Sequence, residues 1–366
     1  MNNPSTRSRR IPAFAAILLA TLLTAAARAQ SNTDLDLLRS VIAQCDAALD
    51  RTDPMYVEFT WRKTSGAAPD STAVKDAPDN AMISEGHTRL WRRGDSYHQD
   101  LDLKHVWRGT GRTSDVSCIV VANDRYLAMF WKRPKFLHIY RYDSRQDLYI
   151  PVETFLPMFP NPDILQFGFS VGSLRVSEAY EIQNKYDPPM YNWTITTQEA
   201  GASTQYLIRS DRIRGKRTGP WYEFVVDASR GYLVTEFRGF SQSHETTTEL
   251  QQLPGGQWFP KSGRISRFAN TENAEFTVNA VRLGEEIPES RFTIEAMAFE
   301  KEETQLTDFS PGGRERTEKA YWAGEWVPLD KLPSDARIEF EKAREELMRG
   351  ATDSFGHEPS ALPPFP

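Results

Sequence analysis

Hydrophobic residues recur at two different spacings along the chain, and the change of spacing divides it into elements. From residue 33 to 52 they come every three or four positions, which is the spacing of one face of an α-helix. Thr33 or Asp34 can cap the start of this helix, and Asp53-Pro54 ends it. The residues with the helical spacing are Leu35, Leu38, Ile42, Cys45 and Leu49.

After residue 54 the spacing falls to two, the period of a strand with one buried face. In the first such segment Val57, Phe59 and Trp61 share one face, while Glu58 and Thr60 share the other. Gly, Pro and Asn-Asp punctuation separates most segments, as turns between antiparallel strands do. We predict strands at Met55–Trp61, His87–Arg93, Ser96–Leu103, Ser117–Val121, Tyr126–Lys132, Phe136–Tyr142, Tyr191–Thr197, Thr204–Ile208, Trp221–Asp227, Tyr232–Phe240, Glu245–Leu250, Trp258–Phe268 and Ala274–Leu283.

Other stretches follow neither pattern. Residues 64–80 are polar and predict a loop, 151–166 are apolar and proline-rich and predict short helical turns, and 350–366 predict disorder. Residues 300–318 are charged and polar, and Asp335–Met348 predicts a short helix with few apolar positions. Because strands do not alternate with helices, the pattern predicts an antiparallel meander that closes into a barrel or forms a strongly curved sheet.

The N-terminus reads as a secretory signal peptide over residues 1–29. Arginines precede an apolar run from Ile11 to Ala27, and Ala27-Arg28-Ala29 provides the small residues that a signal peptidase requires. The apolar run is shorter than the roughly 20 residues that span a bilayer, and polar residues follow at once. We therefore predict a periplasmic or secreted protein that does not span the membrane.

Charge and cysteine content narrow the functional classes. Removing the signal takes away four arginines and no acid, which changes the formal net charge from −6 to −10. An acidic chain is poorly suited to binding nucleic acid, because that needs a basic surface. Cys45 and Cys118 are too few for a disulfide scaffold or a thiolate metal site. We favour two separate buried thiols over a disulfide, which stays the alternative. No cofactor-binding motif is present.

The order of elements resembles the outer-membrane lipoprotein carrier (LolA-like) superfamily, and indicates a divergent and extended member. The matching features are an N-terminal helix before Val57-Glu58-Phe59-Thr60-Trp61, the strand pair around Leu90-Trp91-Arg92-Arg93, and the turns at Asp227–Gly231 and Gly256–Pro260. The resemblance implies an α+β fold: an open, strongly curved antiparallel sheet (an incomplete barrel of about 11 strands) with helices across its mouth. We therefore assign 30–298 to this domain, and from the change of composition we assign 299–349 to a C-terminal extension with a short helix and 350–366 to a disordered tail.

Members of this superfamily hold acyl chains in an apolar concavity, so the resemblance implies a cavity lined by aromatic strand residues. It also implies that a strand arginine, Arg92 or Arg93, helps to latch the helices, and at most one of two adjacent arginines can point inward. A packed aromatic core is the alternative to a cavity. The residues that would line the cavity are Phe59, Trp61, Trp91, Phe130, Tyr222, Phe224 and Trp258.

Two patterns could indicate chemistry instead. Gly168-Phe169-Ser170-Val171-Gly172 fits the G-x-S-x-G nucleophile elbow, with Asp227 and His244 downstream, but Ser173–Tyr180 lacks a helical pattern. His98, Asp100 and Asp102 share one strand face at two-residue steps, which separates the outer two too widely for one ion. We interpret them as an exposed polar face, and we predict neither catalytic residues nor a metal site.

The leading hypothesis is a noncatalytic carrier in the bacterial envelope that holds a lipid or lipoprotein acyl chain. The alternative is a periplasmic sensor or protein-interaction module of the same fold that binds an envelope partner through its C-terminal extension. A serine hydrolase built on Ser170 is third.

Overall fold

The computed structural model describes residues 34–342 and residue 345, except for 66–81, 108–109, 133–134, 143–167, 172–173, 186–189, 202, 214–218, 241–243, 268–271, 302–303 and 311–315. The predicted signal peptide, most of the polar loop at 64–80, the helical turns at 151–166 and the tail at 350–366 lie outside the described residues.

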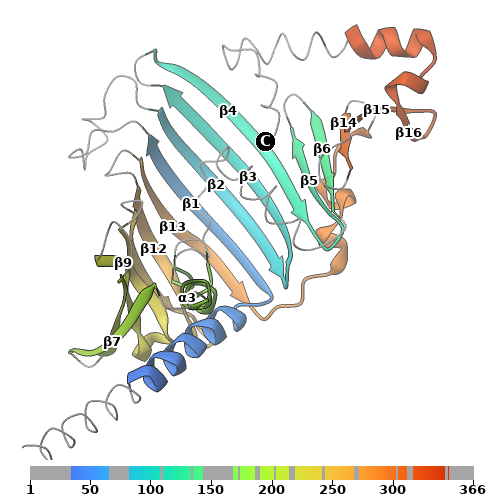
Figure 1. Cartoon of the computed structure of the whole chain (residues 1–366). Coiled ribbons are helices and arrows are strands. Elements are labelled where there is room, and N and C mark those ends of the chain that lie inside the picture. Colours follow the sequence, from blue (N-terminus) through green and yellow to red (C-terminus); the bar gives the residue numbers. More distant parts are fainter. Residues whose placement is uncertain are drawn as a thin grey trace, which may run out of the picture.

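A single open sheet of sixteen strands forms the body of the described chain (Figure 1). The strand order is β16-β15-β14-β6-β5-β4-β3-β2-β1-β13-β12-β11-β10-β9-β8-β7, and the ends of the series do not meet. The strands are β1 (Met55–Ser65), β2 (Met82–Arg93), β3 (Ser96–Trp107), β4 (Arg112–Ala122), β5 (Tyr126–Trp131), β6 (Phe136–Arg141), β7 (Tyr191–Ala200), β8 (Ser203–Arg212), β9 (Gly219–Asp227), β10 (Leu233–Gly239), β11 (His244–Gln252), β12 (Trp258–Arg267), β13 (Glu272–Leu283), β14 (Gln305–Phe309), β15 (Arg316–Trp322) and β16 (Glu325–Pro328).

Two meanders meet at the middle of the sheet. β1 to β6 follow one another as antiparallel neighbours, and so do β7 to β13. β13 then pairs antiparallel with β1, with Trp61 opposite Phe276 and a register shift between Glu58 and Phe59. This long-range pair joins the two halves. All thirteen predicted strands are present, most of them longer than predicted.

The helix that the apolar spacing predicts at 33–52 is present at residues 34–50. Its apolar stripe packs with α3 (Val176–Asn184) on strands β8 to β10. Figure 1 shows both helices crossing one end of the sheet. The buried residues of this contact are Leu38, Val41, Ile42, Cys45, Val171, Val176, Ala179, Ile208, Phe224, Val226, Val234 and Phe237.

α3 corrects one prediction, since Ser173–Tyr180 shows no convincing helical pattern. The helix has nine residues, and only Val176, Ala179 and Gln183 are buried, so its apolar periodicity is too short to recognise. Local contacts define its start, where the Glu178 carboxylate accepts a hydrogen bond from the Arg175 backbone N–H at 2.9 Å.

The C-terminal region also differs from the prediction, because it adds three strands and brings the sheet to sixteen instead of about eleven. β14 runs parallel to β6, with Leu306 opposite Leu137, and β15 and β16 follow as antiparallel neighbours. The charged composition of 300–318 hides these strands. A helix follows over 334–342, which overlaps the predicted Asp335–Met348.

The sheet has two chemically different faces. We call the face of Val57, Phe59 and Trp61 the inner face, and the face of Glu58 and Thr60 the outer face. Neighbours directly opposite each other in paired strands share a face, so the registers extend this division across the sheet. The outer face is polar over the middle strands. Over β4 to β6 it carries a cluster of buried apolar residues, which the residues around Met297 and β14 cover.

Candidate functional site

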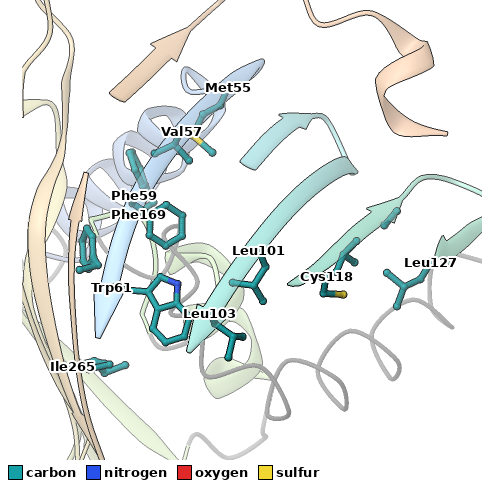
Figure 2. Close-up of a cluster of buried hydrophobic side chains, with 14 of the residues drawn as sticks. Met55, Val57, Phe59, Trp61, Leu101, Leu103, Cys118, Leu127, Phe169 and Ile265 are labelled. Atoms are coloured by element: carbon teal, nitrogen blue, oxygen red, sulfur yellow. The ribbon is translucent and has the colours of Figure 1, made fainter. Parts of the chain in front are cut away.

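An apolar layer on the inner face is the largest hydrophobic feature of the described chain. β1 contributes every second residue, and Figure 2 shows Trp61 of β1 and Leu101 and Leu103 of β3 pointing into one space. Ala48 and Leu49 of the N-terminal helix and Phe169 also join this layer. We call it the inner cluster; its buried strand residues are Met55, Val57, Phe59, Trp61, Leu101, Leu103, Val116, Cys118, Val120, Ala122, Leu127, Met129, Tyr140, Leu233, Phe259, Ile265, Ala274 and Phe276.

Partly buried apolar residues surround the inner cluster. Leu90, Leu250, Val278 and Val281 pack against it while keeping some surface accessible. Val281 lies opposite Val57 in the β1–β13 register, on the inner face, whereas the neighbouring Ala280 is opposite Glu58 and is exposed. Strand residues, rather than helices, supply most of this apolar surface.

Trp61 fits this face because Gly86 lies directly opposite it. The two residues pair across β1 and β2, and a Cβ on Gly86 would lie 2.3 Å from Cζ2 of the indole ring. The indole Nε1 of Trp61 donates a hydrogen bond of 3.0 Å to Oγ1 of Thr88, a buried residue on β2 like Gly86. The Trp61 ring therefore packs in the apolar layer while its one polar atom, Nε1, keeps a hydrogen bond.

The predicted cavity residues do not all share one location. Phe59 and Trp61 belong to the inner cluster, and Trp258 packs against it. Phe224 is buried under the helices, with Tyr222 beside it. Trp91 and Phe130 lie on the outer face, since Trp91 is opposite Tyr56 and Phe130 is opposite Ile119. Strand alternation alone could not separate the two groups.

The two arginines proposed as a latch have different surroundings. Arg93 donates to the backbone oxygen of Ile287 at 3.0 Å and pairs with Glu289 at 3.1 Å, so it holds the segment after β13. Arg92 Nε donates to the backbone oxygen of Gly94, at the end of its own hairpin. These contacts do not involve the N-terminal helix, and a latching role for either arginine stays a prediction.

A cavity of about 1740 Å³ is lined mainly by polar residues of the outer face. Its charged side chains pair with one another: Arg62 with Glu85 at 3.2 Å, for example, and Lys132 with Asp102 at 3.9 Å. Trp61 is the one predicted cavity residue in this lining. Because opposite charges alternate along it, the cavity does not favour a ligand of either charge.

A smaller cavity of about 530 Å³ lies on the same face, between the β1–β2 pair and the segment after β13. Tyr56 and Trp91 form its aromatic wall, with ring centroids 5.1 Å apart. Guanidinium groups cover both rings, Arg282 at 4.4 Å from the Tyr56 ring and Arg291 at 4.2 Å from the Trp91 ring. The aromatic faces are therefore already occupied by cations of the chain itself.

His98, Asp100 and Asp102 were predicted to form an exposed polar face, and for His98 this is wrong. The imidazole is 1% exposed, because Nδ1 lies 2.8 Å from the backbone oxygen of Arg291 and Nε2 lies 2.9 Å from Asp100. Burial opposes ionisation of Asp100, but the contact with His98 and the nearby Arg89 lower its pKa overall. In the part of the chain that the structure describes, no cluster of His, Cys, Asp and Glu has the arrangement of a metal site.

The G-x-S-x-G pattern around Ser170 does not have the strand-to-helix geometry of a nucleophile elbow. Ser170 is buried, in a short connection between isolated bridges at Gly168 and Val171, and α3 begins only at Val176. An elbow instead places its serine directly between a strand and a helix. Asp227 has a structural role, since it accepts hydrogen bonds from Ser203 Oγ at 2.8 Å and from the Arg230 backbone at 3.1 Å.

The preference for two separate thiols is confirmed. Cys45 and Cys118 are both free and buried, one in the N-terminal helix and the other in β4. Burial raises the pKa of each thiol, because a thiolate would lose its hydration there. Among the described residues, no helix is long and apolar enough to cross a membrane.

No protein-family model and no curated protein matches this chain. Several solved structures are similar to it at low identity. A DUF1329 family protein from Desulfovibrio piger is 11% identical, with a TM-score of 0.36 over 70% of this chain and 96% of that one. A putative outer membrane lipoprotein-sorting protein domain from Vibrio parahaemolyticus is 10% identical, with a TM-score of 0.36 over 73% and 99%.

A LolA superfamily protein from Nitrosomonas europaea is 13% identical, with a TM-score of 0.35 over 70% of this chain and 98% of that one. Likeness at these TM-scores carries no argument about ligand or activity.

Proposed function

We propose that this chain is a noncatalytic carrier of the bacterial envelope that binds an acyl chain of a lipid or lipoprotein on its inner face. The observation that carries the proposal is the apolar layer of the inner cluster, which a single open sheet supplies almost entirely from its strands. The centre of this layer is buried, whereas the apolar residues around it, Leu90, Leu250, Val278 and Val281, keep some surface accessible to a ligand. In this proposal the acyl chain packs against these partly accessible residues of the inner face.

Burial of an acyl chain on this face can supply enough free energy to hold the ligand. Burial of apolar surface gains about 0.8 kcal/mol per methylene, so an acyl chain that buries about ten methylenes gains about 8 kcal/mol before the cost of association. Leu90, Val278 and Val281 give accessible apolar positions for this contact. The proposal places the mature chain in the periplasm, after removal of residues 1–29.

Native mass spectrometry of the protein, purified gently after periplasmic expression, tests the proposal directly. We expect a discrete lipid-sized addition to the protein mass that organic solvent releases. A protein that carries no amphiphile and takes none up from lipid micelles would contradict the proposal.

A pair of neighbouring variants locates the ligand. Val281→Trp places a large ring on the inner face beside the inner cluster, whereas Ala280→Trp places the same ring on the exposed outer face. We expect Val281→Trp to lower the occupancy of a bound fatty acid at least tenfold and Ala280→Trp to leave it unchanged. Equal occupancy in both variants would exclude this part of the inner face as the binding surface.

A protein-interaction role is the second candidate, and the C-terminal helix favours it. Ile338 is 53% exposed on this helix, so a partner that covers it would bury apolar surface. We expect Ile338→Lys to abolish capture of an envelope partner by the immobilised protein. Phe240→Lys, at another exposed apolar position, is the control that should retain the partner.

A further inference from the structure

The β7 edge of the sheet lacks the features that normally prevent two strand edges from pairing. β7 is the last strand in the order and pairs with β8 through ten consecutive residue pairs, from Tyr191–Arg212 to Ala200–Ser203, without a register shift. It contains no proline and no lysine, and Glu199 is its single charged residue. In the described part of the chain, no segment pairs with its other side. Edge strands are usually protected by a bulge, a proline or a charge, and β7 has only the charge near its end.

The opposite edge of the same sheet shows the contrast. β16 has four residues, pairs with β15 at four positions and ends at Pro328, which has no backbone N–H to donate. Its neighbour β15 is rich in charged residues. That edge is therefore short and blocked, whereas β7 offers ten residues.

Exposed apolar side chains gather beside β7. Ile213 is 48% exposed, and its N–H donates at 2.9 Å to the oxygen of Met190, immediately before β7. Ile182 is 43% exposed on α3, the helix whose Tyr180 ring lies 5.3 Å from the ring of Trp193. A strand whose single charge lies near its end, with apolar surface next to it, is suited to pairing with another strand.

We propose that the β7 edge is the interface of a homodimer in which β7 pairs antiparallel with β7 of a second copy. A two-fold axis at Thr194 makes the two strands self-complementary. It places Trp193 opposite Ile195 of the partner subunit, both on the inner face, because these positions are equally far from the axis and alternate with exposed Thr194. Asn192 and Thr196, both exposed, oppose each other in the same way on the outer face.

The charge distribution favours a second copy over a charged partner. Glu199 is five residues from Thr194, so the antiparallel register keeps the two Glu199 carboxylates at opposite ends of the interface. The paired centre of β7 is uncharged, although the whole chain carries a formal net charge of −6. Self-association through this strand thus avoids the repulsion that other acidic parts of the surface would cause.

Analytical ultracentrifugation of the mature protein over a wide range of concentrations tests the interface. We expect a dimer for the wild-type chain and a monomer for Thr194→Lys, because the axis at Thr194 brings the two new charges together. Thr247→Lys is the matched control. Thr247 is an exposed threonine on β11, between β10 and β12, so this variant should remain dimeric.

A charge swap separates the interface from a general effect of the substitution. An equimolar mixture of Thr194→Lys and Thr194→Glu should restore the dimer mass, because opposite charges then meet at the centre. A wild-type monomer at every concentration would overturn the proposal. So would a dimer of Thr194→Lys, loss of the dimer in Thr247→Lys, or a mixture that stays monomeric.

Discussion

Residues of the same type lie on opposite faces of the sheet, and the register between paired strands sets which face each takes. Trp61 and Trp91 are both tryptophans in strands with alternating patterns, yet Trp61 is in the inner cluster and Trp91 lines a cavity on the outer face. Alternation fixes which residues within a strand share a face. It does not say which of the two faces will be covered, and so the predicted set of cavity residues mixed both.

Gly86 is the residue on which the placement of Trp61 depends. In Gly86→Ala the new Cβ would lie 2.3 Å from the indole ring, so the ring must move and its hydrogen bond to Thr88 is strained. We expect a loss of about 1–3 kcal/mol in the free energy of unfolding, measured by urea titration. Gly255→Ala is the control, because a Cβ at Gly255 meets nothing within 4 Å. Equal stability of the two variants would show that the ring adapts without cost.

His138 provides a pH-dependent contribution to stability. It lies on β6 among Tyr140 and Phe309, and burial, followed by the nearby Arg316, lowers the pKa of its imidazole from 6.5 to about 4. A folded-state pKa below the unfolded value means that the unfolded chain takes up the proton first. The contribution is therefore complete above pH 6.5 and is lost as the pH falls towards 4, by about 2–3 kcal/mol.

The variant His138→Phe tests this pH dependence. We expect the free energy of unfolding of this variant to change less than that of the wild type between pH 6.5 and 4.5, as measured by urea titration at several pH values. The acids with lowered pKa, Glu58, Asp100 and Asp308, lose their contributions at lower pH in both proteins. Parallel curves for the two proteins would contradict the assignment to His138.

At the scale of elements, the sequence predicts long segments well and short ones poorly. The N-terminal helix and β1 to β13 follow patterns several residues long, which local spacing can reveal. α3 has nine residues, and β14 has five with one fully buried, Leu306. Such short elements are held by their neighbours, in the case of β14 by pairing with β6 and by ion pairs from Asp308 to Arg141 and Lys319, both at 2.8–2.9 Å.

Leu306 tests whether the C-terminal strands stabilise the rest of the sheet. It is 4% exposed and packs in the cluster over the outer face with Leu137 and Met297. We expect Leu306→Ala to lower the free energy of unfolding by about 2–4 kcal/mol, because it leaves a cavity between β14 and β6. Ile338→Ala, at a 53% exposed position, should change it by less than about 0.5 kcal/mol. A small effect of Leu306→Ala would mean that β14 adds little to the stability of the sheet.

At the scale of the whole molecule, the two thiols report on the two halves of the fold. Cys45 lies on the buried face of the N-terminal helix, against β8 to β10, and Cys118 lies in the inner cluster at β4. We expect neither to react with a disulfide reagent in the native protein, and both to react once it unfolds, as measured by mass. Thr60→Cys, at an exposed position, is the control that should react at once. Rapid modification of Cys45 alone would show that the helix detaches while the sheet stays folded.

The sequence by itself determined the strands β1 to β13 and the N-terminal helix, and it favoured two buried thiols over a disulfide, because spacing and residue type are local properties. Only the tertiary structure decided that β13 joins β1, that β14 runs beside β6, and that His98, Trp91 and Phe130 belong to the outer face. These features depend on contacts between residues far apart in the chain. Strand pairing sets them, and no local pattern of apolar and polar residues records which strands will become neighbours.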